Sequence, residues 1–177
     1  MKGYNMKKLA LPLLCALCLL IAVPACAKAG DIEDATKVIN AYYDTLAKGD
    51  LIAALNYMSK EYRAEREQRH RELLENKDGM KIYAIQMEHF SYKITSIDQE
   101  DGEIIAQLAI TEVDAMDVIA KVSEDVGPNS DISEEAFADL VTKKFIELSN
   151  SKALKISTDE FEIILIKEDG QWKINEY

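Results

Sequence analysis

The chain has 177 residues, of which 48% are apolar and 30% are charged, and its formal net charge at pH 7 is −11. This balance is typical of a globular protein and excludes a disordered chain, and the length suits one domain with a leader. The first 26 residues hold three of the 21 basic residues and none of the 32 acidic ones, so the remainder carries 18 − 32 = −14. A domain this acidic repels nucleic acid and anionic lipid head groups, and we therefore expect no nucleic-acid partner.

A signal peptide is predicted at residues 1–26. Lys7 and Lys8 form a positively charged start, and an apolar run of 15 residues, Leu9–Val23, follows them. A bilayer span takes about 20 residues, so this run is too short to cross comfortably and fits the apolar region of a secretory signal instead. Translation from Met6 rather than Met1 would leave the same signal.

The leader ends in a sequence that resembles a bacterial lipobox, because Val23-Pro24-Ala25 precedes Cys26. We expect Cys26 to be lipidated and to anchor the exported protein to the bacterial membrane. The alternative is ordinary signal-peptidase cleavage after Ala27, which would use Ala25 and Ala27 as the small residues and release a soluble secreted or periplasmic protein.

The cysteine count favours lipidation. Cys15 and Cys18 lie inside the leader and are lost with it, so Cys26 is the one cysteine of the mature chain. No disulfide can form within that chain, although the compartment would permit one. Acylation would explain why a lone cysteine is exported.

Residues 27–30 are expected to form a tether, and residues 31–177 a single domain that begins with three helices. Apolar residues at three- and four-residue spacing predict the first helix, which starts with Asp31 as its cap and ends at Gly49. Asp50 is expected to cap a short second helix, and Ser59 a third one that runs to about Asn76.

The next segment is expected to leave the helical pattern. Asp78-Gly79 should end the third helix. Met80–Met87 could be a short strand or an irregular lead-in, and the pattern does not decide between them. From Glu88 the apolar residues recur at every second position, which indicates a strand.

The period-two pattern continues across a turn at Asp101-Gly102 and predicts an antiparallel hairpin with one buried face. Asp114 and Ser133 should then start two helices, with Gly127-Pro128 between them, and these helices make up an insertion over residues 114–153.

A final hairpin is predicted over Phe161–Tyr177, with a two-residue turn at Asp169-Gly170. That turn would pair Glu168 with Gln171, Lys167 with Trp172, and Leu165 with Ile174. Alternation along the strands gives one apolar face made of Phe161, Ile163, Leu165, Trp172 and Ile174. Such a hairpin cannot stand alone in water, so it requires further strands and a helical cover.

These features resemble the nuclear transport factor 2-like, or cystatin-like, superfamily. The similar stretches are a helix ending in Leu46–Asp50 (LAKGD), the hairpin with Asp101-Gly102, and the terminal Glu168–Ile174 (EDGQWKI). Within the superfamily, the closest likeness is to bacterial lipoprotein domains of unknown function, and it covers roughly Asp31 to Tyr177. The resemblance implies an α+β fold in which a curved antiparallel sheet packs on N-terminal helices and forms a cone with an apolar pocket.

The resemblance also implies which residues would line the pocket of that cone. They are Tyr43, Tyr62, Phe90, Tyr92, Leu108, Leu165 and Trp172. The alternative is that these side chains simply fill the core. With a pocket, the expected protein is non-catalytic and binds a small apolar ligand or a partner protein of the envelope. A structural module that forms a homodimer through its sheet is a further alternative.

An enzyme is the remaining alternative, because isomerases and hydratases of this superfamily use a carboxylate base and a tyrosine donor in the cone. The residues themselves argue against it. His70 and His89 are expected at the surface, and Asp44 near the exposed side of its helix. No cluster of His, Cys and Asp has metal-ligand spacing, and no glycine-rich loop is suited to a phosphate. We therefore expect neither a metal nor a cofactor.

Overall fold

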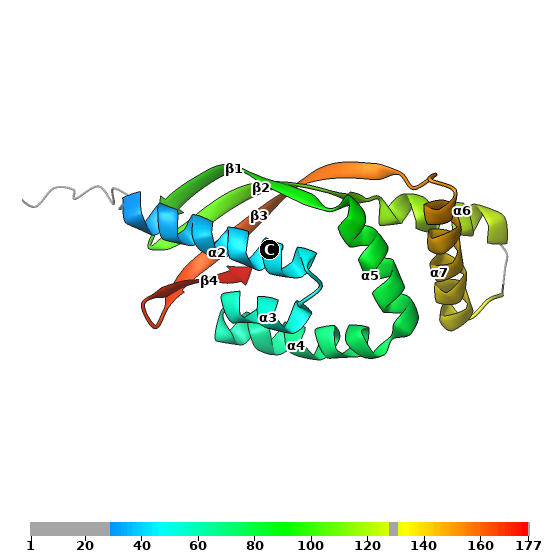
Figure 1. The fold of residues 1–177 in the computed structure, drawn as a ribbon, viewed down its shortest axis with the longest axis horizontal. Helices are drawn as coiled ribbons and strands as arrows, with labels where there is room; N and C mark the ends of the chain where they lie inside the picture. The colour runs from blue at the N-terminus through cyan, green and yellow to red at the C-terminus, as the bar shows by residue number, and fades with distance from the viewer. Residues whose placement is uncertain (1–28, 128–130, 177) are drawn as a thin grey trace, which may run out of the picture.

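The computed structural model of the chain describes residues 29–127 and 131–176, and the predicted signal peptide and Cys26 lie outside these ranges. Six α-helices, one short 3-10 helix and four strands make up the described part (Figure 1). In chain order they are α2 (Ala29–Ala47), α3 (Leu51–Ala54), η3 (Leu55–Tyr57), α4 (Lys60–Glu75), α5 (Lys77–His89), β1 (Ser91–Glu100), β2 (Glu103–Val113), α6 (Ala115–Val126), α7 (Glu134–Asn150), β3 (Ile156–Glu168) and β4 (Gln171–Glu176). The predicted α+β class is confirmed, while the cone shape stays an expectation.

The four strands form one open antiparallel sheet in the order β1-β2-β3-β4. Two-residue turns close both hairpins. Their residues have positive φ angles, 49° and 90° at Asp101 and Gly102, and 51° and 79° at Asp169 and Gly170. This is the geometry of a type I′ turn, which Asp-Gly favours because glycine has no Cβ to clash.

The predicted register of the final hairpin is confirmed at Glu168 with Gln171, at Lys167 with Trp172, and at Leu165 with Ile174. The apolar face predicted for this hairpin is buried at Ile163, Leu165, Trp172 and Ile174, whereas Phe161 is 37% exposed. Phe161 does lie on the inner face by alternation, opposite Leu108. However, β3 is 13 residues long and runs past the part of the sheet that α2 covers.

The predicted end of the third helix at about Asn76 is confirmed, but the prediction that Asp78-Gly79 ends the helical pattern is wrong. Asn76, not Asp78-Gly79, ends α4, and its side-chain Oδ1 accepts hydrogen bonds from the backbone N–H groups of Asp78 (3.1 Å) and Gly79 (2.9 Å) to start α5. A Cβ at Gly79 would lie 2.8 Å from the Leu73 Cδ1 atom, so a larger residue here would force the Leu73 side chain to shift. The undecided segment Met80–Met87 is therefore helical, and the first strand begins at Ser91 rather than Glu88.

The first helix begins two residues earlier than predicted, at Ala29 instead of Asp31. Gly30 of the predicted tether is thus helical, and Asp31 lies in the first turn rather than at the cap. The predicted caps Asp50 and Ser59 are confirmed, because their side chains accept hydrogen bonds from the backbone N–H groups of Ala53 and Tyr62.

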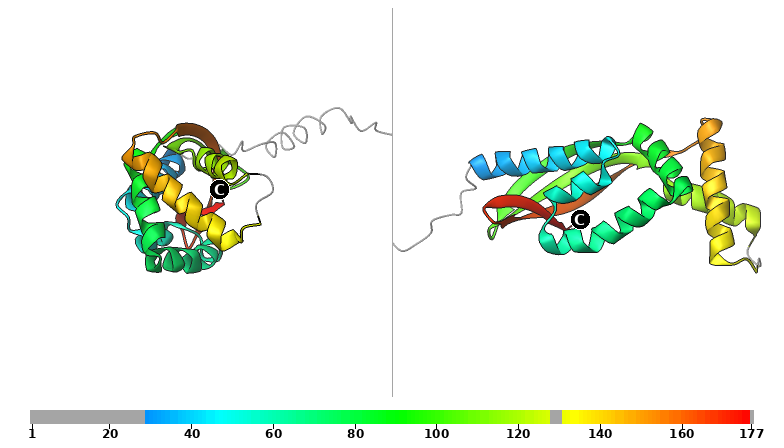
Figure 2. Two further views of the ribbon diagram at one scale, coloured as in Figure 1. Left: turned by 90° about the vertical axis from the view of Figure 1, so that its right-hand side faces the viewer. Right: turned by 60° about the horizontal axis from the view of Figure 1, so that its bottom comes forward.

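The helices cover one face of the sheet. Helix α2 lies along it and contacts β1 and β4, whereas α5 crosses from the end of α2 toward α7 and contacts β2 (Figures 1 and 2). The main core lies between α2, η3 and the sheet, and its fully buried members include Ile39, Tyr42, Leu55, Leu108 and Leu165.

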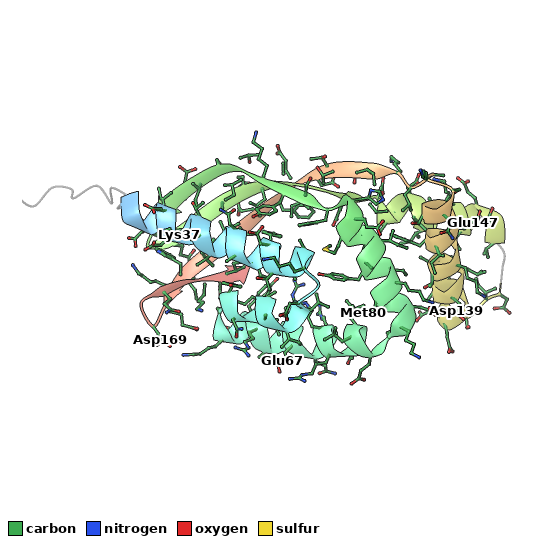
Figure 3. All side chains as sticks on the ribbon, in the orientation of Figure 1. Lys37, Glu67, Met80, Asp139, Glu147 and Asp169 are labelled. Atoms are coloured by element: carbon green, nitrogen blue, oxygen red, sulfur yellow. The ribbon has the colours of Figure 1, made fainter. Side chains whose placement is uncertain are left out.

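The two helices between β2 and β3 build a smaller second core. Val113 of β2, Val118 of α6, and Phe145 and Leu148 of α7 are buried together there, with Ile82 of α5 packed against them. Figure 3 shows that α7, labelled at Asp139 and Glu147, lies at the far end of the molecule from Lys37 and Asp169. Helix α5 therefore packs on the second core through Ile82, while its C-cap residue Phe90 packs on the main core.

Candidate functional site

A cavity of about 230 Å³ lies where α2, α5 and the inner face of the sheet meet. We call it the aromatic cavity, because four of the eight residues that line it have aromatic rings. The lining residues are Tyr42, Tyr43 and Leu46 of α2, Met87 and the C-cap residue Phe90 of α5, Ile110 and Glu112 of β2, and Phe161 of β3. Four separate elements thus supply its wall.

One hydrogen bond holds the helical side of the wall together. The Tyr83 hydroxyl of α5 donates to the backbone carbonyl of Leu46, near the end of α2, at 2.6 Å. Burial raises the pKa of Tyr83 to about 12, so the hydroxyl stays protonated and remains a donor. This bond fixes α5 beside the last turn of α2, which places Met87 and Leu46 on one side of the cavity.

The aromatic rings pack against one another in fixed orientations. The Tyr42 and Tyr43 ring centroids are 5.0 Å apart and their planes meet at 71°, while Phe90 lies 5.8 Å from Tyr43 at 25°. Tyr92 stacks on Tyr43 at 4.8 Å, and its hydroxyl donates to the Asn40 side chain at 3.0 Å. Such edge and offset contacts stabilise the rings beyond simple burial, so this part of the wall is preorganised.

One acidic side chain interrupts the apolar wall. Glu112 continues the inward-facing series Ile104, Ala106, Leu108 and Ile110 along β2, so its carboxyl group faces the helices. Burial raises the pKa of Glu112, and the negative charge of nearby Asp159 raises it further. Within residues 29–127 and 131–176, the carboxylate has no hydrogen-bond or ion-pair partner. A carboxylate in such surroundings favours a proton or a cation.

The residues predicted to line a pocket are divided among several places. Tyr43 and Phe90 line the aromatic cavity. Tyr92 does not line the cavity but stacks on the ring of Tyr43. Leu108 and Leu165 are fully buried in the main core.

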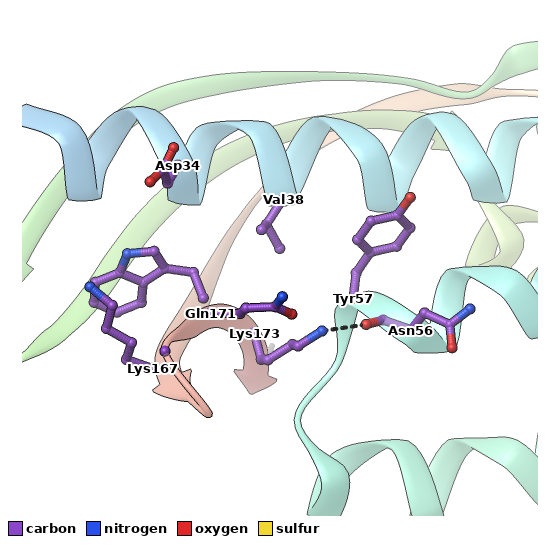
Figure 4. A pocket seen from close by; sticks show the side chains of 9 residues that line it. Asp34, Val38, Asn56, Tyr57, Lys167, Gln171 and Lys173 are labelled. Carbon is purple, nitrogen blue, oxygen red and sulfur yellow. Dashed lines mark hydrogen bonds between the residues drawn. The ribbon is translucent and has the colours of Figure 1, made fainter.

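Tyr62 and Trp172 lie away from the aromatic cavity. Tyr62 lies on α4, where its hydroxyl accepts a hydrogen bond from Arg66 at 2.6 Å. Trp172 borders a different hollow of about 320 Å³ between α2, η3 and the final hairpin (Figure 4).

Hydrogen bonds and an ion pair connect the elements around the hollow at Trp172. Lys167 forms an ion pair with Asp31 at 2.8 Å, and the Trp172 indole N–H donates to the same carboxylate at 3.3 Å. Lys173 donates to the backbone carbonyl of Asn56 at 2.7 Å, as Figure 4 shows. Because Lys167 and Lys173 already bind groups of α2 and η3, this hollow is better explained as the contact region that holds the final hairpin to these helices.

Sequence reasoning missed Glu112, Phe161 and Met87 as members of a site. A signal for Glu112 was present, because it follows four inward-facing apolar residues at the same spacing and so had to face inward. Met87 could not be placed while its segment was undecided between strand and lead-in. Phe161 was placed on the apolar face of the final hairpin but not in a pocket, since alternation alone does not show where the helical cover ends.

Neither histidine lines the aromatic cavity. His89 is exposed. The Nδ1 atom of His70 lies 3.0 Å from the Leu51 carbonyl oxygen, and burial lowers the pKa of this imidazole. His70 therefore joins α4 to α3 rather than standing free at the surface as predicted. Among the described residues, no group of three His, Cys, Asp or Glu side chains could hold a metal ion, and no helix is long and apolar enough to cross a membrane.

Comparisons with known proteins give little further information. No family model matches the chain, and no curated protein matches it. A solved structure, that of the candidate lipoprotein YcdA from Bacillus subtilis subsp. subtilis, shows a structural similarity with 21% sequence identity and a TM-score of 0.31. The match covers 78% of this chain but 42% of the YcdA chain. A similarity at this level does not establish a shared superfamily or a shared function.

Proposed function

We propose that the protein is a non-catalytic, exported domain that is anchored to a bacterial membrane through lipid on Cys26 and binds a small apolar ligand. The observation that supports ligand binding is the aromatic cavity, a concave site with mostly apolar walls and one carboxylate. Sites of this composition are the usual hosts of small molecules. The lipobox-like Val23-Pro24-Ala25 before Cys26 supports export and anchoring.

The volume limits what the cavity can accept. A dry cavity of about 150 Å³ is known to admit benzene, and drug-sized ligands occupy roughly 300–1,000 Å³. At about 230 Å³, the aromatic cavity suits a molecule between these sizes. A single ring or a branched chain with a small polar head would fit, whereas a sterol or a long acyl chain would not.

The position of Cys26 suggests an orientation on the membrane. Helix α2 begins three residues after Cys26, and both hairpin turns lie at the end of the molecule where α2 starts (Figure 1). A lipid on Cys26 would therefore place that end toward the bilayer. The α6–α7 insertion would then project away from it. In this orientation, the aromatic cavity stands between the two ends and remains accessible to solutes.

Methyl NMR spectroscopy of the mature chain tests the proposed ligand site. The Cys26→Ser form avoids lipid and hence detergent, which could itself fill the cavity. Titration with toluene should shift the methyl signals of Met87, Leu46 and Ile110 in the cavity wall. The Val126 methyl signals, which belong to the separate groove between α6 and α7, serve as the control and should stay in place. Equal shifts at all four residues, or at Val126 alone, would contradict the proposal.

A second candidate function, an acid–base enzyme, draws on the same cavity, because Glu112 and two tyrosines line it. Glu112 would act as the base and a tyrosine hydroxyl as the donor to a carbonyl oxygen. Deuterium incorporation next to the carbonyl of cyclohexanone in D₂O distinguishes the candidates. Exchange that exceeds the buffer rate and is lost in Glu112→Gln would favour the enzyme. Exchange at the buffer rate would favour the binding protein.

A further inference from the structure

The side chains of the aromatic cavity suggest the chemical class of its ligand. Four of the eight lining residues are aromatic, and Glu112 is the one ionisable group with a carboxylate among them. The face of an aromatic ring carries negative electrostatic potential and attracts cations, and this is how quaternary ammonium groups are recognised in proteins. A carboxylate in the same wall would add a full negative charge to this attraction.

The arrangement of the rings fits such a role. Tyr42 and Tyr43 stand at 71° to each other, so together they bound a corner, and Phe90 extends the wall beside Tyr43. Phe161 is partly exposed and borders the cavity from β3. A cationic head in this corner would therefore contact aromatic carbon atoms on several sides. These contacts would replace part of its hydration shell.

The surroundings of Glu112 favour a cation over a neutral ligand. Its carboxylate is partly desolvated, and Asp159 on the neighbouring strand adds like charge. Asp159 itself accepts a hydrogen bond from Ser157, whereas Glu112 has no such partner within the described residues. A bound cation would compensate both the desolvation and the repulsion. The net charge of −14 beyond the leader would also draw cations toward the domain.

We propose that the aromatic cavity binds a small organic ammonium ion, with its cationic head against the wall formed by Tyr42, Tyr43 and Phe90 and beside the carboxylate of Glu112. This inference rests on the proposed function, since it names the ligand class of the same site. The cavity volume of about 230 Å³ limits the ligand to a compact quaternary or branched ammonium compound.

Two probes of nearly equal shape separate the contribution of the positive charge to binding from the contribution of apolar contacts. Choline carries the quaternary ammonium group, and 3,3-dimethylbutan-1-ol has the same shape without the charge. Both are titrated into the mature Cys26→Ser chain, with the methyl signals of Met87, Leu46 and Ile110 as the readout. Choline should bind at least about tenfold more tightly than the neutral alcohol, because cation–π and carboxylate contacts act on the charged head alone.

Three variants assign the effect to the residues. Glu112→Gln keeps the shape of the side chain and should weaken choline binding about tenfold while leaving the alcohol unchanged. Phe161→Leu keeps an apolar side chain but removes a ring, and should weaken choline more than the alcohol. Glu160→Gln is the matched control, because Glu160 is exposed and faces the opposite side of β3. It should leave the affinities for both probes unchanged.

The outcomes separate the ligand class from the site itself. Equal affinity of choline and the alcohol, unchanged in Glu112→Gln, would overturn the ammonium proposal and leave an apolar ligand site in place. Choline binding that weakens as much in Glu160→Gln as in Glu112→Gln would reveal general attraction to an acidic surface and would also overturn it. Absence of any shift with toluene, choline and the alcohol would overturn both this inference and the proposed function.

Discussion

Replacing Trp172 by alanine should destabilise the domain by about 3–5 kcal/mol, the range found for truncating a large buried aromatic side chain. The indole is 4% exposed and belongs to the main core. It also donates a hydrogen bond to Asp31, and the Lys167 ammonium lies 5.3 Å from its ring centroid. The ring already borders a hollow of about 320 Å³, so we expect a loss near the lower end of the range.

The polar partners of Trp172 add little to this loss. When the indole is removed, Asp31 keeps its ion pair with Lys167, so no carboxylate is left without a partner. A loss of about 3 kcal/mol corresponds to a melting temperature lower by roughly 6–12 °C for a domain of this size. Trp172→Phe should lose much less, because it retains most of the apolar surface and gives up one hydrogen bond, worth about 1 kcal/mol.

Urea unfolding followed by circular dichroism measures these differences. Tryptophan fluorescence is unsuitable, since Trp172 is the one tryptophan of the chain. Leu74→Ala is the control, because Leu74 is 42% exposed and its truncation should change the free energy of unfolding by less than about 0.5 kcal/mol. A loss below about 1 kcal/mol for Trp172→Ala would show that the indole contributes little to the core, and would refute the argument that it joins α2 to the hairpin.

Three further predictions concern a helix cap, the cavity carboxylate and the anchor. Ser59→Ala should lower the free energy of unfolding by about 1–2 kcal/mol in urea melts, because the buried hydroxyl caps α4 and donates to Asn175 at 2.8 Å. Ser133→Ala, which removes the exposed cap of α7, should lower it less, and the reverse order would contradict this reasoning. The raised pKa of Glu112 means that the folded state holds this proton more tightly than the unfolded state. The contribution of Glu112 to the free energy of unfolding is therefore fully present below about pH 4 and is lost as the pH rises through the raised pKa. Glu112→Gln should therefore raise the melting temperature at pH 7 and not at pH 4, and equal melting temperatures at pH 7 would count against a desolvated carboxylate. Cys26→Ser should move the protein from the detergent phase to the aqueous phase, and a wild-type N-terminus found unmodified at Lys28 by mass spectrometry would exclude the lipid anchor.

The elements that could be predicted from the sequence are those set by local chemistry. Asp169-Gly170 defines the register of the final hairpin because few other residue pairs adopt two successive positive φ angles. The caps Asp50 and Ser59 were identifiable because each side chain bonds within its own first turn. In these cases, the residues that determine the structure are neighbours in the chain.

The remaining features depend on contacts between distant segments. Asp78-Gly79 looks like a helix end, yet Asn76 captures both backbone N–H groups and the chain continues as α5. Phe161 has the alternation of a core residue but lies where the helical cover stops. The aromatic cavity lies between α2 and α5, which the Tyr83 hydroxyl joins through the Leu46 carbonyl, and no local pattern records that contact.

Ligand binding requires that the space between α2, α5, β2 and β3 is an accessible apolar cavity rather than a filled core. Xenon binds in dry apolar cavities, so a crystal structure of the mature chain under xenon pressure tests this claim most directly. We expect a xenon atom bounded by Tyr43, Phe90 and Ile110. We expect no xenon at this place in the Ile110→Phe variant, in which the larger side chain fills the space. A wild-type structure in which Ile110 packs directly on the rings of Tyr43 and Phe90, with no xenon between Ile110 and the rings, would show a filled core instead.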